Sequence, residues 1–528
     1  MGRLRRYRER IQFEMASVRA KSVRALLVRT LESDYGRSRL EASVLAERSL
    51  EWLETLGVEQ VPGQMWLSVP ATPSRRHARN GRRLVRITAV DVGEDTGVWE
   101  TFGLAGMQRR RLLRWIYEIY RQGGWASLRE LAAWANLTPT ALGVRLEPLR
   151  KLGVWLPHVG GVPEGRDALG AEAWLVDRYL ESGQVEIWRS TFGLTVGAWE
   201  MVLRRFVSAL EATEVGHGPQ AISSRVGQSP KEVEQFLAVG GRHRQKRSLR
   251  ELRLSYGTRC TAESGEPDIE AELRGQYGFS QVLARLYHQE LQRVAGQLGS
   301  ERFSEGELVF FAIGCEEGAR ARLSQARHVP VRLHYFTPED AQCGPDSRRP
   351  TRVAELKFGR ILRYATEARA QGALLTLPDL AVLLGIHVDA IRRKLALHRD
   401  VVVPTRGRIK DIGRGLSHRT QIVELYLQMH TETEIVDRTG HSYESVESYL
   451  REFARVVGLA DRGMIAVMIR RVTGRSMALV EAYLELYRRY GRPEYHFRLA
   501  HLRQAFAREE TLGLKKRLSP FHTGGAAR

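Results

Sequence analysis

Hydrophobic residues recur three and four positions apart through most of the chain, which is the spacing of helices that bury one face. Ala42–Leu56 and Val282–Leu298 show this spacing at the start of each half. Shorter segments alternate hydrophobic and polar residues and predict half-buried strands. These segments are Met65–Val69, Leu84–Val92, Leu308–Ile313 and Val329–Tyr335. The pattern therefore predicts a mainly α-helical protein with small β-elements.

The two halves of the chain repeat one another. Arg111–Leu137 aligns with Arg360–Ile386 at a constant offset of 249, without a gap and with nine identical residues. Segments before and after this stretch align in the same order, at offsets between 242 and 249. Because chance similarity does not stay collinear over so long a stretch, we expect a tandem duplication with its junction near residues 240–270.

Each half also contains the pattern of a winged helix-turn-helix. In Thr376–Leu395, Thr376 is the predicted N-cap of a short helix, and Gly385 lies where a tight turn needs a positive φ. Val401–Pro404 and Thr405–Asp411 follow as the two strands of a β-wing would. The counterparts in the first half are Ser127–Leu149, Val154–Pro157 and Gly160-Gly161. An ordinary helical hairpin would also give one such pattern, but its recurrence in both halves favours the winged helix.

Two more helix-turn-helix candidates follow in the second half, at Thr431–Phe453 and Ile465–Tyr487. Weaker copies lie in the first half, at Val185–Phe206 and Ala221–Leu237. The predicted helix after Ser442 carries Arg451 as its only cation and three carboxylates, those of Glu444, Glu447 and Glu452. Since carboxylates that face phosphates weaken binding, we expect residues 431–490 to pack or to bind a protein.

These patterns predict a division of the chain into nine segments. A basic N-terminal helical segment (1–30) comes first, and a basic linker (241–272) separates the two copies. Each copy has three parts: a helical and small β subdomain (31–107 and 273–355), a winged helix-turn-helix (108–165 and 356–416) and a helix-turn-helix region (166–240 and 417–490). A C-terminal helix and tail (491–528) end the chain.

The charge of the chain points to a polyanionic partner. Its 528 residues include 82 Lys and Arg against 61 Asp and Glu, which gives a formal net charge of +21. A hydrophobic fraction of 43% with 27% charged residues is typical of a folded protein. The 73 Arg and 9 Lys are also what a high-GC genome would produce, but coding bias does not explain the excess of bases over acids. We therefore expect nucleic acid as the partner, with the charge divided as +12 before residue 251 and +9 after it.

The cations that we expect to contact DNA lie on the second helix of each winged helix, on the wing, and on a basic hairpin of the first half. In the second half they are Arg392, Arg393, Lys394, Arg406, Arg408, Lys410, Arg414 and Arg419. In the first half they are Arg145, Arg150, Arg75, Arg76, Arg82 and Arg83. A solvated basic face is the alternative interpretation of each group.

The sequence contains no pattern of catalytic or cofactor-binding residues. It has no P-loop and no His-Glu-x-x-His pair, and Cys260, Cys315 and Cys343 are too few for a disulfide framework or a structural zinc site. Two acid pairs stand out, Glu316-Glu317 and Glu339-Asp340, and the second, which follows Pro338 in a predicted turn, is interpreted as a solvated loop. We expect no enzyme activity, metal or cofactor, and neither a signal peptide nor a membrane span, so that the protein is cytoplasmic and associated with the nucleoid.

Val401–Leu427 and the segment QGALLTLPDLAVLLGI (371–386) resemble a prokaryotic family, domain-of-unknown-function family 1670. Similar proteins carry a Thr-Arg-Gly turn, an Asp-Ile-Gly segment and a Ser-His pair before a helix-turn-helix region. Here these are Thr405-Arg406-Gly407, Asp411-Ile412-Gly413 and Ser417-His418. The resemblance covers roughly Tyr277–Tyr490, whereas the first half replaces TRGR by HVGG and lacks the Asp-Ile-Gly segment. The resemblance implies no activity.

From the residues, we expect a sequence-specific protein that binds double-stranded DNA through two homologous halves, as a transcriptional regulator or an accessory factor of a mobile element. A two-part DNA site follows from this expectation. The alternatives are an RNA-binding protein, and a scaffold that binds a protein partner through residues 431–490. A transposase or nuclease is a further, less favoured alternative.

Overall fold

The computed structural model describes residues 2–56, 58, 60–74, 81–160, 168–243, 251–252, 268–298, 303–318, 321, 326–342, 350–398, 401–410, 416–439, 441–491, 497–504 and 507. It divides into two compact units, Met1–Leu397 (unit 1) and His398–Arg528 (unit 2). The division falls inside the segment 356–416 that the sequence groups together, and most of the expected linker 241–272 lies outside the described residues. Helices dominate both units, as the hydrophobic pattern predicts.

The described residues of unit 1 form two small antiparallel sheets. One pairs β1 (Gln64–Pro70) with β2 (Arg82–Thr88), and the other has the order β4 (His328–His334), β3 (Glu307–Gly314), β5 (Ala373–Leu374). The four longer strands confirm the predicted ones, and in β1 every second residue, from Met65 to Val69, is buried. Reciprocal backbone hydrogen bonds of 2.8 Å connect the sheets: Gly63 N–H donates to Val309 O, and Gly306 N–H donates to Trp66 O.

A long helix packs beside each sheet, and a helical hairpin follows it. α4 (Val92–Arg121) contacts β2, and α16 (Pro350–Ala370) contacts β4. The hairpins are α5 (Leu128–Trp134) with α6 (Pro139–Lys151), and α17 (Leu377–Leu384) with α18 (Val388–Leu397). A short helix, α15 (Pro338–Gln342), precedes α16. The order of elements is therefore alike in the two halves.

The turn chemistry of the hairpins agrees with the sequence. Thr376 caps α17, its hydroxyl accepting a hydrogen bond from Asp379 N–H, and Gly385 has a φ of +63°. In the first half Asn136 takes the place of this glycine and has a φ of +57°. Asparagine is one of the few residues that tolerates this left-handed conformation. In each half, two helices thus flank a residue in the left-handed conformation.

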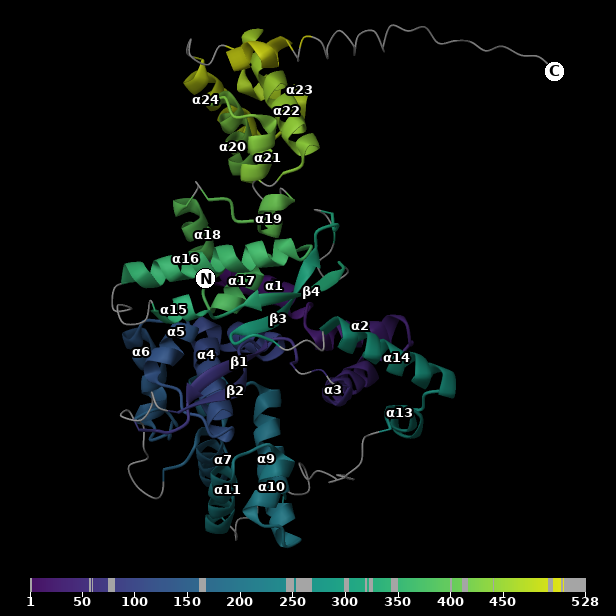
Figure 1. The fold of residues 1–528 in the computed structure, drawn as a ribbon, viewed down its shortest axis with the longest axis vertical. Coiled ribbons are helices and arrows are strands. Elements are labelled where there is room, and N and C mark those ends of the chain that lie inside the picture. The colour runs from purple at the N-terminus through teal and green to yellow at the C-terminus, as the bar shows by residue number, and fades with distance from the viewer. Residues whose placement is uncertain are drawn as a thin grey trace, which may run out of the picture. The chain divides into compact units, whose positions relative to one another are not determined.

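Four helices from both halves form a bundle in unit 1, as Figure 1 shows. They are α2 (Val23–Ser33), α3 (Arg39–Thr55), α13 (Ile269–Tyr277) and α14 (Gln281–Leu298). Their shared core includes Leu45, Trp52 and Leu291, and the hydroxyl groups of Ser49 and Tyr287 form a buried hydrogen bond of 2.8 Å. The N-terminal helix α1 (Gly2–Arg19) packs against α4 and α17.

Among the described residues, five further helices lie in the first half, and five lie between residues 416 and 490 of unit 2. The former are α7 (Ala171–Ser182), α8 (Glu186–Phe192), α9 (Val196–Glu214), α10 (Pro219–Val226) and α11 (Pro230–Arg242). The latter are α20 (Leu416–Leu427), α21 (Glu432–Thr439), α22 (Tyr443–Asp461), α23 (Ala466–Thr473) and α24 (Met477–Tyr490). Gly193, Gly227 and Gly474 end α8, α10 and α23 in the left-handed conformation, and a second helix follows each of them after a short turn. These agree with the predicted elements.

The expected β-wings are absent from the described residues. Val401–Pro404 forms no strand, and Arg406–Ile409 is a short helix, α19. Ile409 N–H and Lys410 N–H donate to Thr405 O and Arg406 O, so these backbone groups are used within the helical turn and not across a hairpin. In the first half, Trp155 forms an isolated parallel bridge with Gly170, and residues 161–167 lie outside the described part. The β-wing prediction is therefore wrong at both places where the structure describes it.

Candidate nucleic-acid interface

The helix α18 was the main DNA-contacting helix expected from the sequence, and α1 lies against its N-terminal part. Arg10 of α1 forms an ion pair of 2.5 Å with Asp389, and Asp389 also accepts a hydrogen bond of 2.7 Å from Arg392. Glu14 lies 3.7 Å from Arg392, and burial raises the pKa of this carboxyl although Arg10 and Arg392 lower it. The charge of Arg392 is thus shared with two carboxylates, so Arg392 is not a free phosphate ligand.

Two lysines lie together where the C-terminal part of α18 meets α16. Lys394 Nζ donates a hydrogen bond of 3.0 Å to Ala354 O, one turn before Lys357 on α16. Burial, the charge of Lys394 and the charge of Arg360 lower the pKa of Lys357 to about 8. No carboxylate among the described residues pairs with either lysine. The pair is a site of unbalanced positive charge, and an anion would stabilise it.

The corresponding pair in the first half has a different chemistry. At the offset of 249, Gln108 and Arg145 stand where the second half has Lys357 and Lys394. Arg145 Nε donates a hydrogen bond of 2.6 Å to Gln108 Oε1, and Gln108 Nε2 donates one of 2.8 Å to Gly385 O. The guanidinium of Arg145 therefore has the side-chain oxygen of Gln108 as an acceptor, whereas the corresponding residue of the second half, Lys357, is a second cation whose pKa the charge of Lys394 lowers. The two halves therefore differ in charge at this position.

Other predicted contact residues of unit 1 differ in exposure. Arg393 on α18 and Arg150 on α6 are exposed, and no described residue forms an ion pair with them. Arg82 is also exposed but forms an ion pair of 3.1 Å with Glu130, and Arg83 is exposed on β2. Arg75 and Arg76 lie outside the described residues. The exposed predicted cations closest in sequence to the lysine pair are Arg392 and Arg393 of α18. Of these two, Arg393 has no carboxylate partner among the described residues.

In unit 2 the predicted contact residues are mostly engaged in the fold. Arg406 is buried, which corrects its expected place on an exposed wing. Arg408 donates to Val401 O and to Gln421 Oε1, and Arg419 forms an ion pair of 3.0 Å with Glu452. Lys410 ends α19 and is partly exposed, and Arg414 lies outside the described residues. Among the described predicted cations, exposed ones therefore lie on α18 and not in the segment after Thr405.

The turns of the α5–α6 and α17–α18 hairpins touch. Asn136 Nδ2 donates a hydrogen bond of 3.2 Å to Leu384 O, and Asn136 Oδ1 accepts one of 2.8 Å from Arg360. From the other side, Arg111 donates to Val382 O at 2.9 Å. Since α6 and α18 begin within a few residues of this contact, their N-terminal ends lie near each other. Recognition helices that enter successive major grooves are about 34 Å apart.

Two buried ion networks, which the sequence did not reveal, support these hairpins. Asp95 of α4 bonds Arg111 and Arg114. Asp340 bonds Arg360 and Arg363 in the same arrangement, at distances of 3.1 and 2.7 Å. Asp340 is buried, so the interpretation of Glu339-Asp340 as a solvated pair is wrong for the aspartate. The signal that could have found these networks is the exact recurrence of Arg111 and Arg114 as Arg360 and Arg363.

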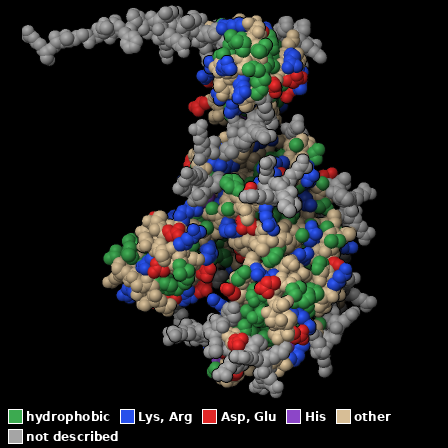
Figure 2. Space-filling view, turned by 180° about the vertical axis from the view of Figure 1, so that it is seen from behind, with side chains coloured by type: hydrophobic (Ala, Val, Ile, Leu, Met, Phe, Trp, Pro, Cys, Tyr) green, Lys and Arg blue, Asp and Glu red, His purple; other side chains and the backbone are tan. Residues whose placement is uncertain are grey.

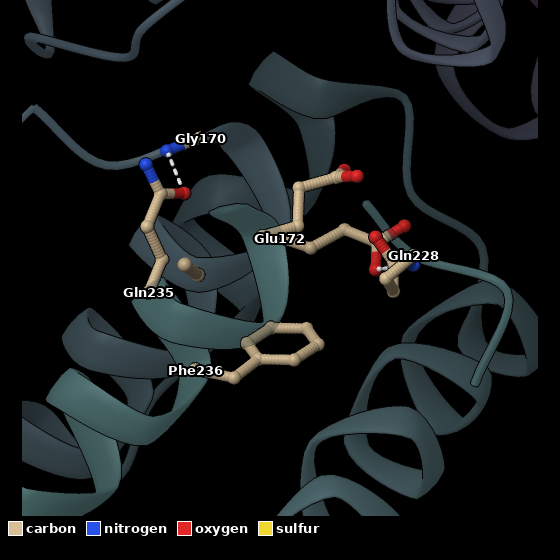
Figure 3. Close-up of a pocket in the computed structure, with 7 residues that line it drawn as sticks. Gly170, Glu172, Gln228, Gln235 and Phe236 are labelled. Carbon is tan, nitrogen blue, oxygen red and sulfur yellow. Dashed lines mark hydrogen bonds between the residues drawn. The ribbon is translucent and has the colours of Figure 1, made fainter. Parts of the chain in front are cut away.

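A small hollow between α7 and α11 is filled by its own polar network (Figure 3). It is lined by Gly170, Glu172, Gln228, Gln235 and Phe236 among others. Gln235 accepts a hydrogen bond from Gly170 N–H, and Glu172 accepts one of 3.0 Å from Arg205 and one of 3.0 Å from Gln228. Burial raises the pKa of Glu172, but Arg205 and Arg121 outweigh it and hold this pKa below its ordinary value. The polar groups here already have partners, so we assign the hollow a structural role.

One group of side chains has metal-ligand spacing but is neutralised by arginines. Asp177, Glu181 and His243 lie close enough to share an ion. Arg178 pairs with both carboxylates, and Arg242 lies 3.2 Å from Asp177. Two guanidinium groups supply the positive charge that an ion would bring, so the arrangement is that of a structural ion cluster.

The comparisons with known proteins leave the activity open. Within the described part of the chain, none of the helices combines the length and the apolar character needed to cross a membrane. No curated protein and no solved structure matches the chain. Residues 273–486, which include α16, α18 and the lysine pair, match the sequence model of the family described as protein of unknown function, DUF1670.

Proposed function

We propose that the chain is a tandem duplication that binds double-stranded DNA, and that α16 and α18 of its second half hold the phosphate backbone. The observation that carries this proposal is the pair Lys357 and Lys394, two ammonium groups without a carboxylate partner among the described residues. Exposed Arg393 lies next to Lys394 in sequence, on the same helix. Phosphate oxygens relieve the repulsion between such cations and release counterions from the DNA.

The hairpins support DNA over other polyanions. Helix, left-handed turn residue and helix recur at α5–α6 and α17–α18, at α8–α9, and at α10–α11 and α23–α24. This geometry allows a second helix to enter a major groove while neighbouring cations contact the backbone. The duplication is supported by the matching bonds of Asp95 and Asp340 and by the reciprocal contacts of β1 and β3.

The contact between the hairpin turns favours one DNA site over two equivalent half-sites. α6 and α18 begin close together, and the Arg145 guanidinium on α6 is already bonded to Gln108. The lysine pair occurs in the second half alone. We therefore place the binding surface on one half and assign the first half a supporting role. A regulator or an accessory factor of a mobile element would use such a surface to hold one DNA segment.

A residue exchange between the halves tests this surface. Lys357→Gln combined with Lys394→Arg recreates the pair that the first half already accommodates, so the fold should be retained. We expect the affinity for a mixed-sequence DNA duplex to fall by about tenfold, and the slope of log affinity against log salt to become shallower by about one. Fluorescence anisotropy of a labelled duplex over a salt series measures both quantities.

Lys151→Gln is the matched control, because it removes one positive charge from an exposed ion pair on α6. It should change the affinity by less than about twofold. If the variant with Lys357→Gln and Lys394→Arg bound DNA as tightly as the unchanged protein, the DNA-binding surface would lie outside the lysine pair. An affinity that does not depend on salt in any variant, or a stronger competition by double-stranded RNA than by DNA, would reject the proposed partner.

The same lysine predicts a dependence on pH. The pKa of free Lys357 is about 8, below the ordinary 10.5, and a nearby phosphate favours the protonated form. Above pH 8, binding must therefore take up a proton, so affinity should fall as the pH rises from about 8 towards 10.5. The exchanged variant lacks Lys357 and should show a flatter profile over this range. Identical profiles for the two proteins would exclude Lys357 from the interface.

A further inference from the structure

The helix α23 of unit 2 exposes an unusual amount of apolar surface. Four large apolar side chains face solvent here: Ile465 at its N-cap (64% exposed), and Val467 (52%), Met468 (56%) and Val472 (49%) within it. Ile469, fully buried, anchors the helix to the core of unit 2. On the face of unit 2 that Figure 2 shows, hydrophobic side chains lie next to Lys and Arg side chains. Soluble proteins rarely leave such groups uncovered unless they bind something.

The spacing of these residues gives the surface a direction. Ile465, Met468 and Val472 follow one another at intervals of three and four, which places them in one row along the helix. Val467 and Arg471, four apart, form the neighbouring row, and Arg470 lies at its edge. Both arginines are exposed, and neither forms an ion pair with a described residue. The surface is thus an apolar ridge with two positive charges along one side.

The first half provides a natural comparison, because α10 occupies the corresponding place at an offset of 247. Both helices keep the buried isoleucine, Ile222 in α10 and Ile469 in α23, and both end at a left-handed glycine. At the exposed positions, however, α10 has small or polar residues, namely Gln220, Ala221, Ser223 and Ser224 where α23 has Val467, Met468, Arg470 and Arg471. The fold therefore does not require the ridge of α23.

We propose that the exposed face of α23 binds an acidic amphipathic helix of a partner protein. A row of side chains at intervals of three and four fits the groove between the rows of another helix, which buries all four apolar groups. Acidic residues beside the apolar face of that helix would pair with Arg470 and Arg471, since charge complementarity selects the partner. DNA phosphates would pair with the arginines but leave the apolar groups in water. The eight residues of α23 present a short row and not the broad apolar face of a membrane-surface helix.

The test uses the full chain and a labelled peptide of about 15 residues, near the shortest length that forms a stable helix. The peptide carries leucine at helical spacing and glutamate on the flanking positions; a second peptide has lysine in place of glutamate. We expect the acidic peptide to bind, and the basic one to bind at least about tenfold more weakly. Equal binding of both peptides would overturn the proposal.

Residues of α10 provide the matched variants. Val467→Gln with Met468→Ala removes half of the apolar ridge, and Arg470→Ser with Arg471→Ser removes its charge. Each pair should weaken binding of the acidic peptide by about tenfold, while the circular dichroism melting curve stays unchanged. The reverse exchange, Gln220→Val, Ala221→Met, Ser223→Arg and Ser224→Arg, should create a second binding site. Peptide binding that is unchanged in both α23 variants would overturn the assignment to a protein partner. Variants that still bind the peptide but no longer bind DNA or lipid vesicles would overturn it as well.

Discussion

Replacement of Lys21 by Met should lower the free energy of unfolding of unit 1 by about 3 to 5 kcal/mol. The side chains of Lys21 and Asp379 are both fully buried, and Lys21 Nζ lies 2.6 and 2.5 Å from the two carboxylate oxygens. Methionine fills a similar volume but leaves the Asp379 charge without its partner. That carboxylate cannot move to solvent, because it also accepts a hydrogen bond of 2.7 Å from Thr376 N–H at the start of α17.

Tryptophan fluorescence during denaturant unfolding measures this effect in the full chain. All ten Trp residues lie between positions 52 and 199, so the signal reports unit 1 alone. Lys151→Met is the control, since Lys151 is exposed and its distance to Glu147 is 3.7 Å. This control should change stability by no more than about 0.5 kcal/mol. A loss of similar size in both variants would mean that the buried pair contributes no more than a surface pair.

Asp340→Asn and Asp95→Asn should each destabilise unit 1 by about 3 kcal/mol or more. Each substitution removes the negative charge between two guanidinium groups while it keeps the shape of the side chain. Asp340→Asn should have at least as large an effect, because Arg114 keeps a second partner, Glu94, at 2.5 Å. Arg110 and Arg114 outweigh burial and lower the pKa of Glu94 to about 2, so this partner stays charged at neutral pH.

The same fluorescence experiment measures both aspartate variants, and Asp177→Asn provides a comparison at a buried carboxylate outside the two networks. A large effect at one aspartate with none at the other would show that the two networks do not have equivalent roles. That result would count against the proposed duplication of the structural core, although it would leave the DNA proposal open to its own test.

Local features were predictable from the sequence because they depend on neighbouring residues. The cap at Thr376 and the left-handed turn at Gly385 follow from residue type and spacing, as do the alternating strands around Met65 and Val331. The arrangement of helix and turn around Ser476 follows in the same way, since its hydroxyl accepts a hydrogen bond from Leu479 N–H. Such features need no knowledge of what packs against them.

Features that depend on distant contacts were not predictable. A basic N-terminus gives no sign that Lys21 meets Asp379, which lies 358 positions away. Lys357 occupies an ordinary position in the pattern of α16, and its importance arises from Lys394, which arrives from another helix. Arg406 is expected on an exposed wing because its segment follows the predicted helix-turn-helix, yet the structure buries it. In each case tertiary packing outweighs the local pattern.

The first half has the pair Gln108 and Arg145 where the second half has Lys357 and Lys394. This difference has a consequence for how the two copies evolve and for the direction in which the chain would bind DNA. In a homodimer, every mutation occurs in both subunits, so a surface gained on one side is gained on the other. Two copies joined in one chain escape this constraint, and each can accumulate substitutions alone. A fused pair that has diverged in this way lacks a true twofold axis. On the proposed function, it would therefore bind DNA in a single orientation, and a site that reads differently in its two directions would suit it better than a palindrome.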